Sequence, residues 1–295
     1  MPDSRAGKVG IETLLIESAE GASSEIRVVG EPENASAVIV CFPAMGVKAE
    51  KYDVLASSLH RAGLAVVIAE LRGHGSSSVR ASRTQDFGYH TMLENDFPAV
   101  LHKAKELFPN VPCYLLGHSL GGQLASLYLA AYPGVAEGLI LTASCTVYYR
   151  GWKFPKNLSI LLFSQFSALI ATLLGHFPGR KIGFAGREAS SVMRDWARNC
   201  RTGIYRLSDS TVDFEAALAK LDCTLIAIRF SDDQFAPKQA TRNLLQKFKA
   251  SKARQFTLDA NDLGCSKADH FSWLKHPQAV TGAIVLALAD RPQHH

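Results

Sequence analysis

The chain has 295 residues, of which 47% are hydrophobic and 20% are charged, and its net charge is +5. This composition is typical of a globular protein with a large core, and it excludes an intrinsically disordered chain. The length fits one large domain, or one domain with an insertion. The excess of positive charge is too small to indicate a nucleic-acid-binding protein, so we expect no nucleic-acid partner.

The amino-terminal stretch, MPDSRAGKVGIETLLIESAEG, lacks the continuous apolar region of a secretory signal. We therefore expect a cytoplasmic protein. The six cysteines are scattered along the chain without a C-x-x-C motif. Their positions favour buried free thiols in a reducing compartment over disulfides or a zinc site.

Eight short β-rich runs follow one another along the chain. The first two, residues 10–18 and 24–30, alternate in polarity and predict an antiparallel edge. Later runs are apolar throughout, which predicts strands buried on both faces of a mostly parallel sheet. These runs are residues 35–42, 64–70, 113–117, 138–144, 224–230 and 254–259. Helical patterns lie between the strands at residues 52–62, 96–108, 122–131, 237–248 and 278–289. Alternating strands and helices predict a doubly wound α/β sheet.

Nearly eighty residues between the strands at 138–144 and 224–230 show no strand pattern. They contain the apolar run 158–174, whose seventeen residues are at the lower limit for crossing a bilayer. A helix that is apolar nearly all round usually packs inside a protein. We therefore expect this run to belong to an inserted helical cap, residues 146–212, and we do not expect membrane association. The α/β core is then residues 1–145 and 213–295.

Within this cap, Arg187, Arg194, Arg198 and Arg201 are spaced 7, 4 and 3 residues apart, so on one helix they share a face. The pattern fits a solvated basic face. The alternative is a face that attracts an acidic substrate.

Residues 117–121 read Gly-His-Ser-Leu-Gly and satisfy G-x-S-x-G. An apolar strand precedes the motif and a helix follows it, as a nucleophile elbow requires. The turn would lift the Ser119 hydroxyl above the carboxyl edge of the sheet, at the positive end of the next helix. A phosphate-binding glycine turn or a plain tight turn is the alternative.

A serine hydroxyl is a weak nucleophile and needs a base that is itself oriented by an acid. On an α/β sheet the partners follow in the order Ser, Asp or Glu, His. Asp232 and Asp233 come directly after the strand at 224–230, and His270 comes after the strand at 254–259. The acid and the base therefore leave the same edge of the sheet as Ser119.

With GHSLGG, DDQFAP and DHFSW in this order, the chain resembles the α/β-hydrolase superfamily over nearly its whole length. It is also similar to a poorly characterised bacterial branch that shares GHFPGR and MRDWAR in the cap. The resemblance implies catalytic roles for Ser119, Asp233 and His270. It favours Asp233 over Asp232 because the family's acid typically lies four residues before a proline, here Pro237.

The resemblance also implies an oxyanion hole made by two backbone N–H groups. They belong to Leu120, directly after the nucleophile, and to Met45, in the loop after the strand at 35–42. Many relatives have a histidine where this chain has Pro43.

Together these features predict a serine hydrolase that cleaves a carboxylic ester or thioester and needs no metal or organic cofactor. Its expected partner is a small-molecule acyl ester or thioester, and the oligomeric state is left open. The same residues also fit an acyltransferase, a serine peptidase or a ligand-binding protein without catalysis.

Overall fold

The computed structural model describes residues 10–289. Residues 1–9 and 290–295 lie outside the described part, and with them the two ends of the predicted core and the beginning of the amino-terminal stretch.

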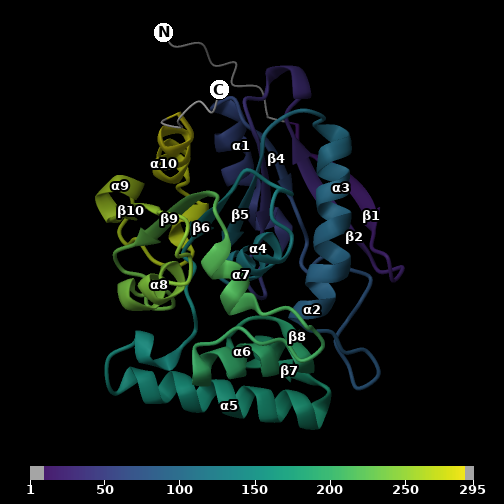
Figure 1. The fold of residues 1–295 in the computed structure, drawn as a ribbon, viewed down its shortest axis with the longest axis vertical. Helices are drawn as coiled ribbons and strands as arrows, with labels where there is room; N and C mark the ends of the chain where they lie inside the picture. The colour runs from purple at the N-terminus through teal and green to yellow at the C-terminus, as the bar shows by residue number, and fades with distance from the viewer. Residues whose placement is uncertain (1–9, 290–295) are drawn as a thin grey trace.

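An eight-stranded sheet forms the centre of the molecule, in the order β1-β2-β4-β3-β5-β6-β9-β10 (Figure 1). Its strands are β1 (Glu12–Glu17), β2 (Ser23–Val29), β3 (Val38–Phe42), β4 (Ala65–Ile68), β5 (Cys113–His118), β6 (Gly138–Thr142), β9 (Thr224–Phe230) and β10 (Arg254–Leu258). β2 pairs antiparallel with both β1 and β4, and the other neighbours are parallel. The predicted mostly parallel sheet with an antiparallel edge is confirmed.

Helices cover both faces of the sheet, so successive side chains of a central strand enter two different cores. In β3, Val38 and Val40 pack into one core, whereas Ile39 and Cys41 pack into the other. α3, α4 and α7 contribute to the first core, and α1 and α10 to the second. The helices that flank the sheet are α1 (Asp53–Arg61), α2 (Tyr89–Thr91), α3 (Phe97–Leu107), α4 (Leu120–Ala131), α7 (Phe214–Lys220), α8 (Lys238–Leu245), α9 (Ala260–Leu263) and α10 (Gln278–Ala289).

Between β6 and β9, residues 146–212 form a segment that we call the insertion, and it contains two α-helices and two strands. They are α5 (Lys156–Leu174), β7 (His176–Pro178), β8 (Arg187–Ala189) and α6 (Ser190–Thr202). We expected no strand in this segment, but β7 and β8 pair antiparallel. Each has three residues, which is too short to show an alternating pattern. Arg187 lies in β8, so the expected arginine face is reduced to the three arginines of α6.

α5 lies along one end of the molecule, and α6, β7 and β8 separate it from the sheet (Figure 1). We expected its apolar residues to pack inside the protein, and this prediction holds for one side of the helix only. Ile160, Leu161 and Phe163 are partly buried against an apolar cluster that includes Phe177 and Trp196. The buried residues of α5 are the small ones, Ser164, Ser167 and Ala171. Seven large apolar side chains are exposed instead: Leu158, Leu162, Phe166, Leu169, Ile170, Leu173 and Leu174. Among the described residues, α5 is the one helix long and apolar enough to cross a membrane.

Candidate active site

Ser119 lies on a strained turn between β5 and α4. Its backbone has φ of +54° and ψ of −115°, a conformation that residues other than glycine rarely adopt. The flanking glycines permit this turn, because a Cβ at Gly117 would overlap the backbone of Gly122 and one at Gly121 would overlap the carbonyl oxygen of Phe42. The turn therefore places Ser119 at the carboxyl edge of the sheet, at the amino end of α4.

Asp233 and His270 come together at the same edge of the sheet. The Nδ1 atom of His270 lies 2.8 Å from Oδ2 of Asp233, and both side chains are buried. The other carboxylate oxygen, Oδ1, accepts hydrogen bonds of 2.8 Å from the backbone N–H groups of Phe235 and Ala236. Both oxygens of Asp233 are therefore held, and the His270 ring is fixed with Nδ1 toward the carboxylate.

The two neighbouring carboxylates, which could compete for His270, bind backbone groups instead. Asp232 accepts a hydrogen bond from the backbone N–H of Ala268, and its own N–H donates to the Ala268 carbonyl, each at 3.0 Å. Asp269 accepts hydrogen bonds from the N–H groups of Phe271 and Ser272. Asp232 thus ties the turn after β9 to the loop that carries His270.

In the loop after β3, the N–H groups on either side of Met45 have hydrogen-bond partners. The N–H of Ala44 donates to the Tyr52 hydroxyl at 2.8 Å, and the N–H of Gly46 donates to Nε2 of His74 at 3.1 Å. Among the described residues, no hydrogen bond uses the N–H of Met45 or that of Leu120. Both residues line the pocket that contains Ser119. These two amides are the pair that the resemblance implies.

Two residues that hold this loop were missed by the sequence reasoning, Tyr52 and His74. Tyr52 accepts from the Ala44 N–H, and its hydroxyl lies 2.8 Å from Nδ1 of His118 in the elbow. Burial beside His270 holds the pKa of His118 well below its usual value, so this ring is neutral. The hydrogen bond between the Tyr52 hydroxyl and Nδ1 of His118 therefore links the loop to the elbow.

His74 joins the same loop to the insertion. Its Nε2 lies 3.0 Å from Oε1 of Glu188 in β8, and Oε1 also accepts from the N–H of Gly186. His74 and Glu188 are both buried. The sequence held a weak signal for His74, which lies in a glycine-rich loop after a strand, but no local spacing indicates Glu188, 114 residues away.

Ser119, His270, Met45 and Leu120 line one pocket of about 130 Å³. The rest of its wall is apolar apart from Gln123, and it includes Phe184 and Trp196 of the insertion, with Cys145, Val147, Phe235 and Phe271. No aspartate, glutamate, lysine or arginine of the described residues lines it. Within residues 10–289, no hydrogen bond joins the Ser119 hydroxyl to the His270 ring, whose Nδ1 faces Asp233. Catalytic hydrogen bonds often tighten only when substrate binds.

Cys145 is the one thiol in the pocket wall. Burial, with the Asp233 charge nearby, raises its pKa well above the usual value for a thiol. Because the thiolate is the nucleophilic form of cysteine, Cys145 is unreactive at neutral pH. This leaves Ser119 as the candidate nucleophile among the described residues of this pocket wall.

Comparison with known proteins shows the family to which the chain belongs. Residues 33–258 match the family model described as serine aminopeptidase, S33. The chain is 30% identical to the monoacylglycerol lipase of Mycolicibacterium smegmatis over 54% of this chain and 51% of that protein, so it spans about half of that relative's length. It is 30% identical to the monoglyceride lipase of Mus musculus over 71% of this chain and 69% of that protein.

A solved structure extends the likeness of fold to nearly the whole chain. Est1E from Butyrivibrio proteoclasticus, solved with ferulic acid bound, has a TM-score of 0.64 at 16% identity. The match covers 94% of this chain and all of that one. The predicted α/β-hydrolase fold is therefore confirmed.

Proposed function

The chain belongs to the serine aminopeptidase S33 family of α/β-hydrolases, and on that premise we propose that it hydrolyses carboxylic esters or thioesters through an acyl-enzyme on Ser119. One observation carries the proposal. Ser119, on its strained turn, opens into the pocket that also contains His270, and His270 is held by Asp233.

In this mechanism the Ser119 oxygen attacks the carbonyl carbon while Nε2 of His270 takes the hydroxyl proton. Asp233 keeps Nδ1 protonated and stabilises the imidazolium that forms. The tetrahedral intermediate collapses when the carbon–oxygen or carbon–sulfur bond breaks, and His270 gives its proton to the leaving alcohol or thiol. Water, activated by His270, then attacks the acyl-enzyme and releases the carboxylic acid.

The negative charge of each tetrahedral intermediate develops on the former carbonyl oxygen. Within residues 10–289 the N–H groups of Leu120 and Met45 have no other partner, so they are free to bind this oxygen. Donors fixed in place before the reaction stabilise the charge without reorganisation. Tyr52 and the neutral form of His74 supply this fixity, because they occupy the N–H groups on either side of Met45.

The pocket wall favours an uncharged substrate. An aminopeptidase binds the charged amino end of a peptide and needs an acidic group near the nucleophile, yet no acidic residue of the described chain lines this pocket. An apolar wall with Gln123 and two backbone donors suits the acyl part of a neutral ester. We therefore favour ester or thioester hydrolysis over peptide hydrolysis.

We also propose that the insertion, residues 146–212, acts as a cap over this site. Gly183, Phe184 and Ala185 form one wall of the pocket, and Trp196 of α6 forms another. In the mechanism above, this wall limits the access of water to Ser119 and confines the acyl chain.

The central experiment replaces the nucleophile. We expect Ser119→Ala to fold normally, to lose labelling by a fluorophosphonate, and to lower kcat on a p-nitrophenyl ester by about 10⁴-fold or more. Ser266→Ala, which changes an exposed serine in the loop before His270, is the matched control and should keep labelling and kcat. Turnover of Ser119→Ala within about tenfold of the parent would exclude Ser119 as the nucleophile.

The size of the pocket predicts the preferred acyl chain in solution. Its volume of about 130 Å³ is smaller than the ~300 Å³ at which typical ligand pockets begin. We expect kcat/KM, measured without lipid on p-nitrophenyl esters of graded length, to be highest for short acyl groups and to fall for long ones. A maximum of kcat/KM at long acyl chains would contradict the idea that Phe184 and Trp196 limit the length of the pocket.

A further inference from the structure

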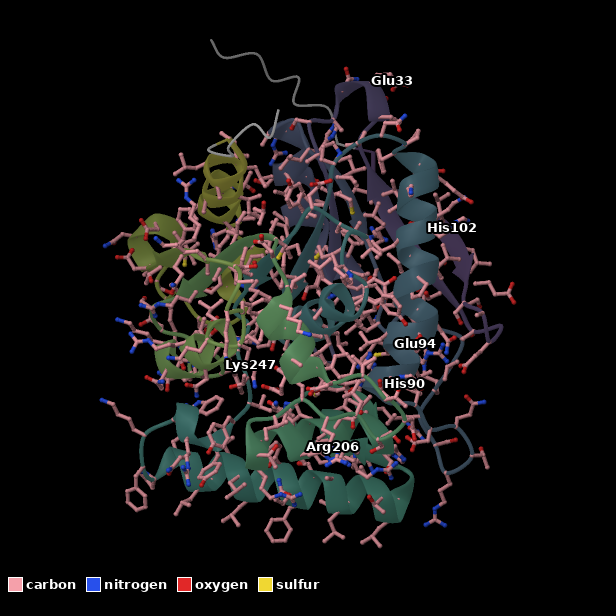
Figure 2. The ribbon with its side chains drawn as sticks, viewed as in Figure 1. Glu33, His90, Glu94, His102, Arg206 and Lys247 are labelled. Atoms are coloured by element: carbon pink, nitrogen blue, oxygen red, sulfur yellow. The ribbon has the colours of Figure 1, made fainter. Side chains whose placement is uncertain are left out.

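The outer side of α5 is an apolar surface that nothing in the described structure covers. Its seven large apolar side chains lie at positions 158, 162, 166, 169/170 and 173/174, one or two per helical turn, and are between 37% and 64% exposed. Phe154 before the helix and Ile182 after it are exposed at 76% and 59%. Figure 2 shows the side chains of α5 projecting away from the rest of the molecule. Contiguous apolar surfaces of this kind mark interaction sites in soluble proteins. We call these nine residues the α5 face.

The inner side of α5 prevents the helix from burying this face by rotation. Ser164, Ser167 and Ala171 are small, so α5 lies close against the insertion, and Gln165 donates a hydrogen bond of 3.0 Å to the Ala197 carbonyl in α6. A rotation would bury large side chains where small ones now fit. Crossing a bilayer would break the same contacts. The helix can therefore meet an apolar phase only by lying flat against it.

The charge around the α5 face selects the partner. Residues 138–187 contain no aspartate or glutamate. They contain six exposed basic residues: Arg150, Lys153, Lys156, Arg180, Lys181 and Arg187. None of the six forms an ion pair within residues 10–289. A symmetric dimer through this face would bring like charges together, because a two-fold interface pairs the same patch on both subunits. Anionic lipid headgroups complement them.

We propose that the α5 face is a docking surface for a bilayer that contains anionic phospholipid, on which α5 lies parallel to the membrane plane. The apolar side chains enter the boundary between headgroups and acyl chains, and the basic residues at both ends of the helix bind the headgroups. This proposal replaces our expectation of no membrane association, which rested on α5 being packed inside the protein.

The α5 face is close to the proposed active site. Phe163 of α5 packs edge-to-face on Phe184, with ring centroids 4.9 Å apart, and Phe184 lines the pocket beside Ser119. One layer of side chains therefore separates the docking helix from the pocket wall. A docked molecule holds its pocket next to the lipid surface.

Vesicle binding tests the proposal without reference to activity. The purified full chain is mixed with vesicles of phosphatidylcholine alone, or of phosphatidylcholine with about 30% anionic phosphatidylglycerol, and bound protein is measured by flotation. We expect the parent to bind the anionic vesicles at least tenfold more tightly than the neutral ones, and Ser119→Ala to bind like the parent. Binding therefore succeeds or fails independently of the proposed catalytic role of Ser119.

Two variants separate the apolar and basic contributions. The triple change Leu162→Gln, Phe166→Gln and Leu169→Gln alters side chains that are more than half exposed, and should lower partitioning at least tenfold. Lys153→Gln, Arg180→Gln and Lys181→Gln should abolish the preference for anionic vesicles. The matched control changes three exposed apolar residues of the α/β domain, outside the insertion, to glutamine: Leu15, Val54 and Val135. This control should bind like the parent. Thermal unfolding checks that each variant folds.

Two results would overturn the proposal: a parent that binds neither kind of vesicle, or an α5 triple variant that binds like the parent. If the parent binds neither kind and is dimeric by light scattering, while the α5 triple variant is monomeric, a second copy of the chain is the occupant instead.

Discussion

Asp232 and Asp233 are neighbours in the chain, but the turn after β9 directs their carboxylates to different partners. Asp233 binds the His270 ring, whereas Asp232 binds the backbone of Ala268, two residues before that histidine. One carboxylate therefore orients the imidazole, and the other positions the loop that carries it. The buried position of Asp233 strengthens its interaction with the ring, because water does not screen it.

This difference predicts unequal effects of two similar substitutions. Asp233→Asn should lower kcat by about 10⁴-fold, because an amide donor facing Nδ1 favours the wrong tautomer of His270. Asp232→Asn keeps an oxygen that can accept from Ala268 and should lower kcat less than tenfold. The measurement is kcat of both purified variants on one p-nitrophenyl ester. Equal losses would show that we have assigned the acid wrongly.

At the scale of residues, the sequence predicts the groups that lie in motifs and misses the groups that hold them. Ser119, Asp233 and His270 each follow a strand, so their common edge can be derived from the topology alone. Tyr52 and His74 contact the loop around Met45 from positions 8 and 28 residues further along the chain than their partners Ala44 and Gly46. A tyrosine near the start of a helix or a histidine in a loop has no spacing that identifies its partner. Only the three-dimensional structure shows these contacts.

At the scale of elements, the contact between β8 and the core depends on the charge of His74. Burial disfavours the charged ring, but the nearby Glu188 carboxylate outweighs burial, with a smaller contribution from Glu70, so the pKa of His74 is raised above 6.5. A raised pKa in the folded state means that the protonated form stabilises the fold, with Nε2 donating to Glu188 instead of accepting from the Gly46 N–H. This stabilisation is complete below the unfolded pKa of about 6.5 and is lost as the pH rises through the higher folded value.

We therefore predict a loss of stability on the alkaline side that depends on this pair. Urea unfolding of the parent between about pH 6 and pH 9 should show a free energy of unfolding that declines relative to that of the double variant His74→Gln, Glu188→Gln. The exposed pair His102 and Glu106 provides the control, because the same two changes there should leave the pH dependence unchanged. Parallel curves for the parent and the His74 variant would contradict the prediction.

The arginines of α6 have partners that the sequence does not reveal. Arg194 donates to Ser190 and Ser191. Arg198 donates to the carbonyl of Arg206 and to Ser208. Arg198 and Arg201 line a separate hollow, and no arginine of the described residues lines the pocket with Ser119. The structure thus favours a structural role for this face over the attraction of acidic substrates.

The triple change Arg194→Gln, Arg198→Gln and Arg201→Gln tests this interpretation. We expect kcat/KM to change less than about threefold for a neutral and for an anionic ester alike, because the charges lie outside the pocket. Rate measurements at 0.1 M and 1 M salt check it, since the Debye length falls from about 10 Å to about 3 Å over that range. A loss confined to the anionic ester, and reduced by salt, would restore the steering role.

At the scale of the whole molecule, the sheet could be predicted strand by strand, but the orientation of α5 could not. Apolar runs between helical patterns fix a parallel sheet because both faces of such strands must be buried. In α5, apolar residues occupy nearly every side of the helix, so the pattern does not tell which side faces the protein. The small residues Ser164, Ser167 and Ala171 mark the inner side, and their role is evident only once α6 is placed against them.

The distribution of charge is also a property of the whole molecule. The six basic residues of the acid-free segment 138–187 exceed the net charge of +5 of the entire chain. The molecule is therefore electrically polar, with its positive end at the insertion. A field of this kind orients a protein as it approaches a charged surface, and orientation before contact raises the rate of productive encounters.

Gly46 limits how freely the parts of this protein could be recombined. A Cβ at this position would overlap the backbone of Ala185, so the loop of Met45 and the insertion touch main chain to main chain. His74 and Glu188 close the same junction from the side. An insertion transplanted from a homologue would have to reproduce the path of residues 185–188, or the recipient would lose the neighbour that shapes its loop. Exchange of substrate preference by swapping this segment therefore requires the junction to be carried along with it.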